Sequence, residues 1–439
     1  MAAALALIVL GFPSLRAQPA TPPPSVPDAL DLKTAIGYAI QNNFAIRQAR
    51  ERIKQQQGIV VEVTAREIPN VNASGAYQHN STDIAQSSPA SDRTWSLSIL
   101  ATQNLFAGGG IRSAIKSSQL ARDAAVLDLK AVINDALLNV RTDYFTVLLT
   151  REKIIVQEKN LDLLQQQLKN VSNRFEAGTV SSFEKLRAEV AVANAQVPLI
   201  TARNDYRLAI ESLRQSLGFT TNKAEDFRKV PTFAGTLDYT PVTFDLQSAF
   251  DAAQTNRPDL QRLAKLTDSR DELITTARST YYPSVQAFGG YELRKGATND
   301  FGDSRDGFLI GLQSNWAIFD GRATSGRVAQ ARSLYEQTKL SLTEAELNAE
   351  VEVRRAYSTW QQATELADAS KKVVEQAEEA VRLATARYDA GTATQLDVLQ
   401  AQVDLTTART NQLQAYYSYN VAVATLRRAM GQPDEFVAN

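Results

Sequence analysis

Side chains that could carry out catalytic chemistry are scarce in this chain of 439 residues. It contains no cysteine and a single histidine, His79, so disulfides and thiolate metal sites are excluded. No serine, histidine and aspartate combine as a nucleophilic triad, and the glycine run at 108–110 lacks the context of a phosphate-binding loop. We therefore expect no enzymatic activity, no metal and no cofactor, with His79 an ordinary surface residue.

Two acidic residues stand at matching distances from glycines. Glu184 follows Gly178 by six residues, and Asp397 follows Gly391 by six. If each glycine ends one helix and each acid lies in the first turn of the next, the helix dipole would stabilise the carboxylate. The elements around these glycines therefore decide what the acids can do.

The sequence around these glycines occurs twice. Residues 174–179 are RFEAGT, and residues 387–392 are RYDAGT, 213 positions later. The offset holds without a gap through the following helix-forming sequence, and an offset of 214 aligns the earlier part of each copy. Units of this length indicate a duplicated assembly, with repeats at 31–218 and 245–431, rather than a solenoid.

Each repeat is predicted to open with an amphipathic helix. Apolar residues recur at helical spacing over about 32–66 and about 246–280. Pro69 and Pro283 follow, and a proline disfavours helix in the residue before it. We expect one helix per repeat, ending before its proline.

Alternation of apolar with polar or small residues at period two then predicts two strands per repeat. Polar loops at about 78–93 and about 294–306 join the strands of each pair. The alternating sets are Val71, Ala73, Gly75 and Tyr77; Trp95, Leu97, Ile99 and Ala101; Val285, Ala287, Gly289 and Tyr291; and Phe308, Ile310 and Leu312. The aromatic residues of these segments, with Trp316, could form a belt at a lipid interface or pack in a core.

Proline-free stretches follow the strands, at 111–175 and 324–388. As helices of about 65 residues they would be rods of roughly 95 Å. Apolar or small residues recur along both in steps of three and four, for example Val353, Ala356 and Trp360. This heptad pattern predicts coiled-coil packing.

Each long helix is predicted to turn back on itself. Gly178 and Gly391 can take the left-handed conformation that ends a helix. Ser181 and Thr394 can then cap the return helices, expected over about 183–217 and 396–430. Arg174 and its counterpart Arg387 can serve the last carbonyls of the outgoing helices. The two similar hexapeptides are thus the tips of two helical hairpins.

The remaining segments carry few signals. The net charge of −1 gives no reason to expect nucleic acid as a partner. An apolar run followed by small residues predicts a signal peptide over 1–17, and a proline-rich linker spans 18–30. The inter-repeat segment 219–244 and the tail 432–439 hold no motif and suggest extra structure around the hairpins.

The strand–turn–long-helix junctions, the R-[FY]-x-x-G-T tips and the duplication over 31–431 resemble the TolC family of outer-membrane efflux proteins. The resemblance implies a mainly α fold with four strands per chain and long antiparallel coiled-coil hairpins. In a homotrimer these would form an α-barrel continuing a twelve-stranded transmembrane β-barrel in the outer membrane of a Gram-negative cell.

The same resemblance implies an exit duct for multidrug efflux or type I secretion. Its partners would be outer-membrane lipid, a periplasmic adaptor (membrane fusion) protein and an inner-membrane pump of the RND, ABC or MFS type. It assigns adaptor docking to the tips: Arg174, Gly178, Thr179, Val180, Ser181, Arg387, Gly391, Thr392, Ala393 and Thr394.

The resemblance also implies a periplasmic gate near the second tip, with candidates Asp397, Gln400, Glu184 and Tyr388. A threefold axis would make Asp397 a ring of three acids, which favours cations. Here Gln400 stands where the family has a second acid, and Ala393 where a gate-locking arginine can occur. The competing interpretations are an ordinary solvated acid in the first helical turn for Asp397, stabilised by the helix dipole, and simple packing for Tyr388.

Two alternatives lie outside this class. A periplasmic coiled-coil adaptor would account for the hairpins but has no need of four amphipathic strands. A structural rod would have no strands at all.

Overall fold

A computed structural model describes residues 29–81, 92–219, 231–296 and 300–436. The predicted signal peptide, most of the linker and parts of the loops between strands therefore lie outside the described residues. The helices are α1 (Leu32–Asn42), α2 (Phe44–Thr64), α3 (Gly110–Glu176), α4 (Ser182–Leu217), α5 (Leu246–Asn256), α6 (Pro258–Arg278), α7 (Ala323–Asp389) and α8 (Gln395–Ala429), with 3-10 turns η1 (Ala65–Glu67) and η3 (Ser279–Tyr281). The strands are β1 (Ala29–Leu30), β2 (Asn70–His79), β3 (Arg93–Ala107), β4 (Thr232–Phe233), β5 (Ser284–Lys295) and β6 (Ser304–Asn315).

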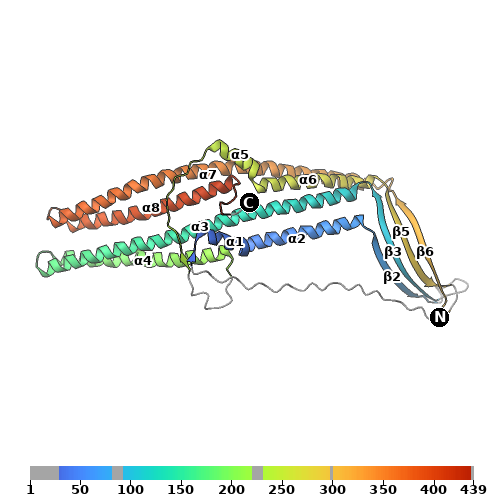
Figure 1. The fold of residues 1–439 in the computed structure, drawn as a ribbon, viewed down its shortest axis with the longest axis horizontal. Helices are drawn as coiled ribbons and strands as arrows, with labels where there is room; N and C mark the ends of the chain where they lie inside the picture. The colour runs from blue at the N-terminus through green and yellow to red at the C-terminus, as the bar shows by residue number, and fades with distance from the viewer. Residues whose placement is uncertain (1–28, 82–91, 220–230, 297–299, 437–439) are drawn as a thin grey trace.

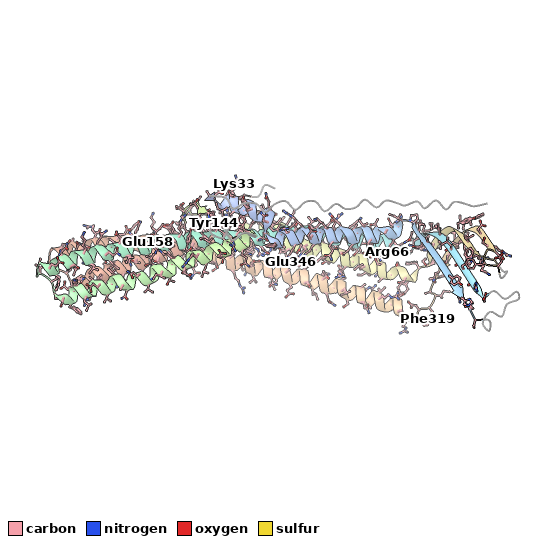
Figure 2. All side chains as sticks on the ribbon, turned by 90° about the horizontal axis from the view of Figure 1, so that it is seen from below. Lys33, Arg66, Tyr144, Glu158, Phe319 and Glu346 are labelled. Atoms are coloured by element: carbon pink, nitrogen blue, oxygen red, sulfur yellow. The ribbon has the colours of Figure 1, made fainter. Side chains whose placement is uncertain are left out.

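The molecule is a long helical shaft with a small sheet at one end (Figure 1). The four longer strands lie at that end, and the turns between α3 and α4 and between α7 and α8 form the two tips at the other end. Figure 2 places Glu158 on the tip side of the shaft, Tyr144 near its middle, and Arg66 and Phe319 close to the strands. No helix in the described ranges has the length and apolar character needed to cross a bilayer.

The two longest helices, α3 and α7, each contain 67 residues, as the proline-free stretches predicted. Each pairs with its own return helix, and α3 also packs along α8. The predicted heptad line is buried in α7, where Val353, Ala356 and Trp360 are at most 8% exposed. The return helix α4 contains Pro198 in its interior, whereas α8 contains no proline.

The opening helix of each repeat is broken, so the prediction of one continuous helix is wrong in both. Asn43 separates α1 from α2 with ψ of 129°, and Arg257 separates α5 from α6 with ψ of 116°. The Asn43 side chain accepts hydrogen bonds from the N–H groups of Ala45 and Ile46, which caps α2. Pro258 forces Arg257 out of the helical region.

Two glycines allow the ends of the return helices to approach these junctions closely. Gly218 and Gly431 end the hairpins with φ of 75° and 69°. A Cβ on Gly218 would lie 2.4 Å from the carbonyl oxygen of Asn42, and one on Gly431 would lie 2.8 Å from the backbone nitrogen of Arg257. Both positions therefore require glycine for conformation and for space.

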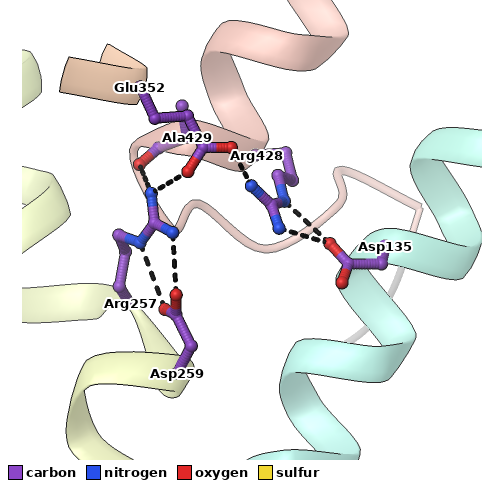
Figure 3. A network of polar contacts seen from close by, with 6 residues as sticks. All are labelled: Asp135, Arg257, Asp259, Glu352, Arg428 and Ala429. Atoms are coloured by element: carbon purple, nitrogen blue, oxygen red, sulfur yellow. Dashed lines mark hydrogen bonds and ion pairs between the residues drawn. The ribbon is translucent and has the colours of Figure 1, made fainter. Parts of the chain in front are cut away.

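The second junction is held by a charged network (Figure 3). The Arg257 guanidinium donates to both oxygens of Asp259 at 3.1 and 2.7 Å and to Glu352 at 2.6 Å. Arg428 bridges Glu352 to Asp135 of α3. Burial disfavours the charge of Arg257, but the hydrogen bonds that it donates to two carboxylates outweigh burial and raise its pKa. The network thus ties the second repeat to the first.

The inter-repeat segment crosses the middle of the shaft. β4 pairs in parallel with β1. The Tyr144 hydroxyl donates to the carbonyl of Leu30, and Arg151 donates to the carbonyls of Phe233 and Gly235 at 2.8 and 2.7 Å. Each repeat has its own buried cluster at this level, one around Tyr144 and one around Trp360. The segment therefore acts as a belt over both clusters.

The sheet has the order β2-β3-β5-β6, with every pairing antiparallel. The register places the predicted apolar sets opposite one another, for example Ile99 opposite Tyr291 and Tyr291 opposite Phe308. All members of these sets therefore share one face. The other face carries mostly small and polar residues, including Ser74 and Ser98, whose hydroxyl oxygens lie 2.8 Å apart, but also Leu100, Phe288 and Leu309.

The apolar face of the sheet is uncovered in the single chain. Phe308 and Ile310 are 83% and 81% exposed, and Tyr77 and Trp316 are also largely exposed. Packing in a core of the same chain is therefore wrong for Tyr77, Tyr291 and Trp316, whereas Trp95 is half-buried against Phe301. β2 and β6 are the outer strands, each with one unpaired edge in the described sheet.

Candidate functional site at the hairpin tips

Both tips turn through the same hydrogen-bonded geometry. Gly178 has φ of 72°, and its N–H donates to the carbonyl of Phe175 while the next N–H, of Thr179, donates to Arg174. Gly391 repeats this with φ of 74°. This is the Schellman end of a helix, as predicted. A Cβ on either glycine would meet nothing within 4 Å, so the requirement is for conformation alone.

The threonines after the glycines reinforce the turns. The Thr179 hydroxyl donates to the carbonyl of Arg174 at 2.9 Å, and the Thr392 hydroxyl donates to that of Arg387 at 3.1 Å. These bonds satisfy carbonyls that the helix leaves without a partner. The remaining tip positions, Val180 and Ala393, are half-buried.

The return helices are capped at the predicted residues, but not equally. The Ser181 side chain accepts from the N–H of Glu184 at 3.3 Å. Thr394 caps α8 in the same way, and the Asp397 carboxylate also accepts from the N–H and hydroxyl of Thr394 at 2.7 and 2.8 Å. The second tip therefore has a complete capping box, and the first has only half of one.

Asp397 is thus an exposed carboxylate held by its own helix terminus. The bonds from Thr394 lower its pKa below the usual range of an aspartate, so it is ionised at neutral pH. Gln400, one turn later, donates to Asp404 at 2.9 Å. In the single chain Asp397 is an exposed acid in the first turn of α8, and its bonds to Thr394 are an addition that sequence analysis did not predict.

An ion pair joins the two tips within the chain. Arg174 donates to Asp389 at 2.9 Å, and its guanidinium lies 4.9 Å from the ring centre of Tyr388. The prediction that Arg174 serves helix carbonyls is therefore wrong, because its side chain reaches the other hairpin. Sequence analysis missed Asp389, although its equivalence to Glu176 in the duplicated hexapeptide marks it.

The predicted gate residues do not converge in one chain. Tyr388 contacts Arg174, whereas Glu184 and Asp397 each lie at the start of their own return helix. Behind the second tip, Gln395 is 3% exposed, and neither atom of its amide has a partner in the described structure. The hydroxyl of Tyr388 is likewise buried without a partner there. Of these two buried polar groups, sequence analysis named Tyr388 and missed Gln395.

The described residues show no arrangement for metal chemistry. They contain no group of three histidine, cysteine, aspartate or glutamate side chains suited to a metal ion. His79 is exposed at the end of β2, 3.8 Å from Asp92. The geometry offers turns, caps and ion pairs for contact with other chains.

Comparison with known proteins decides the class. The family model described as outer membrane efflux protein matches residues 35–219 and 249–432. This chain belongs to that family. The efflux protein is 26% identical over 412 residues to the cobalt-zinc-cadmium resistance protein CzcC of Cupriavidus metallidurans, which covers 92% of this chain and 90% of CzcC. It is 24% identical over 372 residues to the outer membrane protein TolC of Vibrio cholerae, covering 84% and 83% of the two chains.

Solved structures show the same fold. The Campylobacter jejuni CmeC outer membrane channel aligns with a TM-score of 0.80 at 16% identity, covering 91% of this efflux protein and 85% of CmeC. VceC of Vibrio cholerae aligns with a TM-score of 0.77 at 17% identity, covering 91% and 96%. The protein is an outer-membrane efflux channel of the TolC family, which favours the channel over the adaptor and rod alternatives.

Proposed function

We propose that this efflux protein is one subunit of a homotrimeric exit duct that carries substrate from an inner-membrane pump to the cell exterior. The sheet carries this proposal. One face of the sheet is apolar and exposed, the other is mostly small or polar, and the sheet ends in two unpaired edges. In lipid every backbone polar group must be paired, so such a sheet is stable only when closed.

Closure by copies of the same chain satisfies this requirement. Three copies bring twelve strands, with β6 of each copy beside β2 of the next. The apolar face, including Phe308 and Ile310, then faces lipid, and the face with Ser74 and Ser98 lines a polar lumen. The shaft continues the lumen away from the membrane.

The tips are proposed to dock a periplasmic adaptor. They project beyond the rest of the shaft, and their backbone shape is set by the two Schellman turns (Figure 1). A rigid turn loses little entropy on binding, which favours recognition by a helical partner. An adaptor and an inner-membrane pump would supply the energy for transport.

Asp397 is proposed to form a ring of three carboxylates at the periplasmic entrance. Its exposure and its lowered pKa keep the charge available to the lumen at neutral pH. Such a ring favours cations. Gln400 adds no charge one turn deeper, and the next acid on the same helix face is Asp404, seven residues after Asp397. Tyr388 and Glu184 would set the position of the tip helices around the ring.

Gel mobility of outer-membrane extracts tests the assembly. A heat-labile band near three times the monomer mass is expected before boiling and a single monomer band after it. A soluble, elongated species absent from the membrane fraction would overturn the duct.

Single-channel conductance then tests the gate. Asp397→Ala is expected to raise conductance and reduce cation selectivity. Asp404→Ala, seven residues later on the same helix face, tests whether a second acid contributes. An Asp397→Ala channel with the conductance and cation selectivity of the unmodified protein would remove Asp397 from the gate while leaving the duct intact.

A further inference from the structure

Within one chain, each contact between the two repeats forms once, and the contact between the equivalent elements with the repeats exchanged does not form to a comparable extent. β3 pairs with β5, and α3 packs along α6 and α8. In the duplication, β3 is equivalent to β6, β5 to β2, α3 to α7, α6 to α2 and α8 to α4. Replacing each element by its equivalent gives the contacts β6 with β2, α7 with α2 and α7 with α4. None of the exchanged contacts forms to a comparable extent within the chain. Every such contact therefore has an unoccupied counterpart on the surface.

The tip contact has a charged counterpart of the same kind. Arg174 binds Asp389 above the ring of Tyr388. An offset of 213 converts this set into Arg387 with Glu176, above the ring of Phe175. The exchanged set keeps a guanidinium, a carboxylate and an aromatic ring, although two of the three residue types differ.

The two charged members of the exchanged set are unused within the chain, whereas the ring of Phe175 has Lys185 Nζ 5.4 Å from its centre. Arg387 and Glu176 are both exposed, and neither side chain makes a hydrogen bond or ion pair in the described ranges. Phe175 is 38% exposed. Arg174, which has its partner, is only half-exposed. Arg387 and Glu176 therefore have no ion-pair partner in the described ranges, whereas Arg174 and Asp389 bind each other.

We propose that Arg387 pairs with Glu176 of a second copy of this chain, across the ring of that copy's Phe175. The inference rests on the proposed trimeric duct and gives its entrance two kinds of bridge. The Arg174–Asp389 bridge lies within each copy, and the Arg387–Glu176 bridge lies between neighbouring copies. The site around Arg387 is therefore complete only when a second copy supplies the acid, whereas the site around Arg174 is complete within one chain.

The helices behind the tips carry the matching surface. Within the chain, Asn160 of α3 contacts Thr406 of α8 through a hydrogen bond of 3.0 Å. The exchanged pair is Val373 of α7 with Ala193 of α4. Val373 is 50% exposed, and Val190 and Val197, which flank Ala193 by three and four residues, are 50% and 63% exposed. The contact within the chain is polar and the proposed contact between copies is apolar.

A second pair shows the same change. Lys153 of α3 lies 3.5 Å from Gln414 of α8, and its exchanged pair is Leu366 with Thr201. Leu366 is 50% exposed, and Ile200, beside Thr201, is 65% exposed. Uncovered apolar side chains therefore stand on both sides of the proposed interface, which is where a second copy would remove them from water.

Cross-linking between copies tests the pairing, and the absence of native cysteines gives it a clean background. Glu176→Cys in one copy and Arg387→Cys in a differently tagged copy are co-expressed and treated with a short bismaleimide. Covalent dimers containing both tags are expected on boiled gels. Each single variant expressed alone reports any linking between like residues and should give far less dimer.

The pair Arg174→Cys and Asp389→Cys in one chain is the matched control. It should react without joining two chains, because this bridge lies within a copy. An intact heat-labile trimer in which the control reacts but Glu176→Cys and Arg387→Cys do not would overturn the pairing and leave the duct standing. The absence of any trimer in the unmodified protein would overturn both.

Charge exchange provides a test without a reagent. Glu176→Arg and Arg387→Glu should each lower the temperature at which the trimer band dissociates, and the two together should restore it. High salt should weaken the difference, because exposed ion pairs are screened. A double variant as unstable as the sum of the two single variants would contradict the pairing.

Discussion

Each repeat has a joint, the break between its first two helices (α1–α2 or α5–α6), and the two repeats build it by different chemistry. In the first, Asn43 caps α2 and donates to the carbonyl of Ser216 at 2.7 Å, so the joint is neutral. In the second, Arg257 provides no side-chain cap and instead binds two carboxylates and the carbonyl of Ala429. The backbone break is the same, but only the charged joint reaches the other repeat, through Arg428 and Asp135.

The difference shows what a duplicated chain can change. The neutral Asn43 cap bonds only to groups of its own repeat, and its burial desolvates no charge. A buried ionic network costs desolvation energy, and it is sensitive to the loss of any member. The fold therefore depends on the backbone geometry of the joint, while this ionic link joins side chains of the second repeat to Asp135 of the first.

The largest effect should come from the feature that the joints share. Gly218→Ala and Gly431→Ala should each destabilise by about 3 kcal/mol, because a left-handed residue with a side chain is strained and the Cβ would meet backbone. Thermal unfolding in detergent, followed by helical circular dichroism, measures this. Gly178→Ala and Gly391→Ala are the controls at the tips and should cost about 1 kcal/mol, since only strain is involved. Equal costs at all four glycines would show that space at the joints is unimportant.

The next effect should separate the joints. Arg257→Met should cost about 2 to 3 kcal/mol, because it leaves Asp259 and Glu352 without their shared cation, although both carboxylates are partly exposed. Asn43→Ala should cost about 1 kcal/mol, the usual value of a lost cap. The same unfolding measurement compares them, and a larger loss from Asn43→Ala would reverse the assignment.

Acid should weaken the charged joint only. Burial favours the neutral form of Asp259, but the hydrogen bond and charge of Arg257 outweigh burial and lower its pKa. The unfolded chain, with an ordinary aspartate pKa near about 3.9, then binds the proton first as pH falls. Stability from this pair is present above about pH 4 and is lost as pH falls through the folded-state pKa.

The difference in unfolding midpoint between the unmodified protein and Arg257→Met should report this loss of stability. The unfolding midpoints of the unmodified protein and of Arg257→Met should differ at pH 7 and converge below about pH 4. The gap between the unmodified protein and Asn43→Ala should stay constant, because asparagine does not titrate. A constant gap for Arg257→Met would show that Asp259 does not contribute through its charge.

The smallest effect concerns the tips. Asp397→Ala breaks the complete capping box and should cost about 1 kcal/mol. Glu184→Ala should cost only a few tenths, because the Glu184 carboxylate returns no bond to Ser181. Unfolding midpoints again compare them, and equal costs would mean that the two caps are equivalent despite their geometry.

Sequence periodicity predicted most of the fold, because its signals are local. The long helices, the four strands, the tip glycines and both N-caps follow from spacing and residue type. The breaks at Asn43 and Arg257 were missed because the apolar pattern continues across them. The Pro258 signal and the two asparagines at 42–43 could have shown them.

The partners of charged side chains could not be predicted in the same way. Arg174 and Asp389 lie 215 residues apart, and only the packing of α3 on α8 brings them together. The hexapeptide comparison predicted that both arginines would have the same role. The fold gives them different surroundings, because α3 has α8 beside it and α7 has no equivalent helix in its own chain.

Pro198 has a mechanical consequence. It lacks the N–H that would bond to the carbonyl one turn earlier, and its ring crowds that turn, so α4 is prone to bend there. The equivalent position in α8 is Asn411, which keeps its N–H. The first hairpin, α3–α4, should therefore bend more easily than the second hairpin, α7–α8. A load applied at the tips would flex the first hairpin about Pro198, while the second would pass the load on to its charged joint.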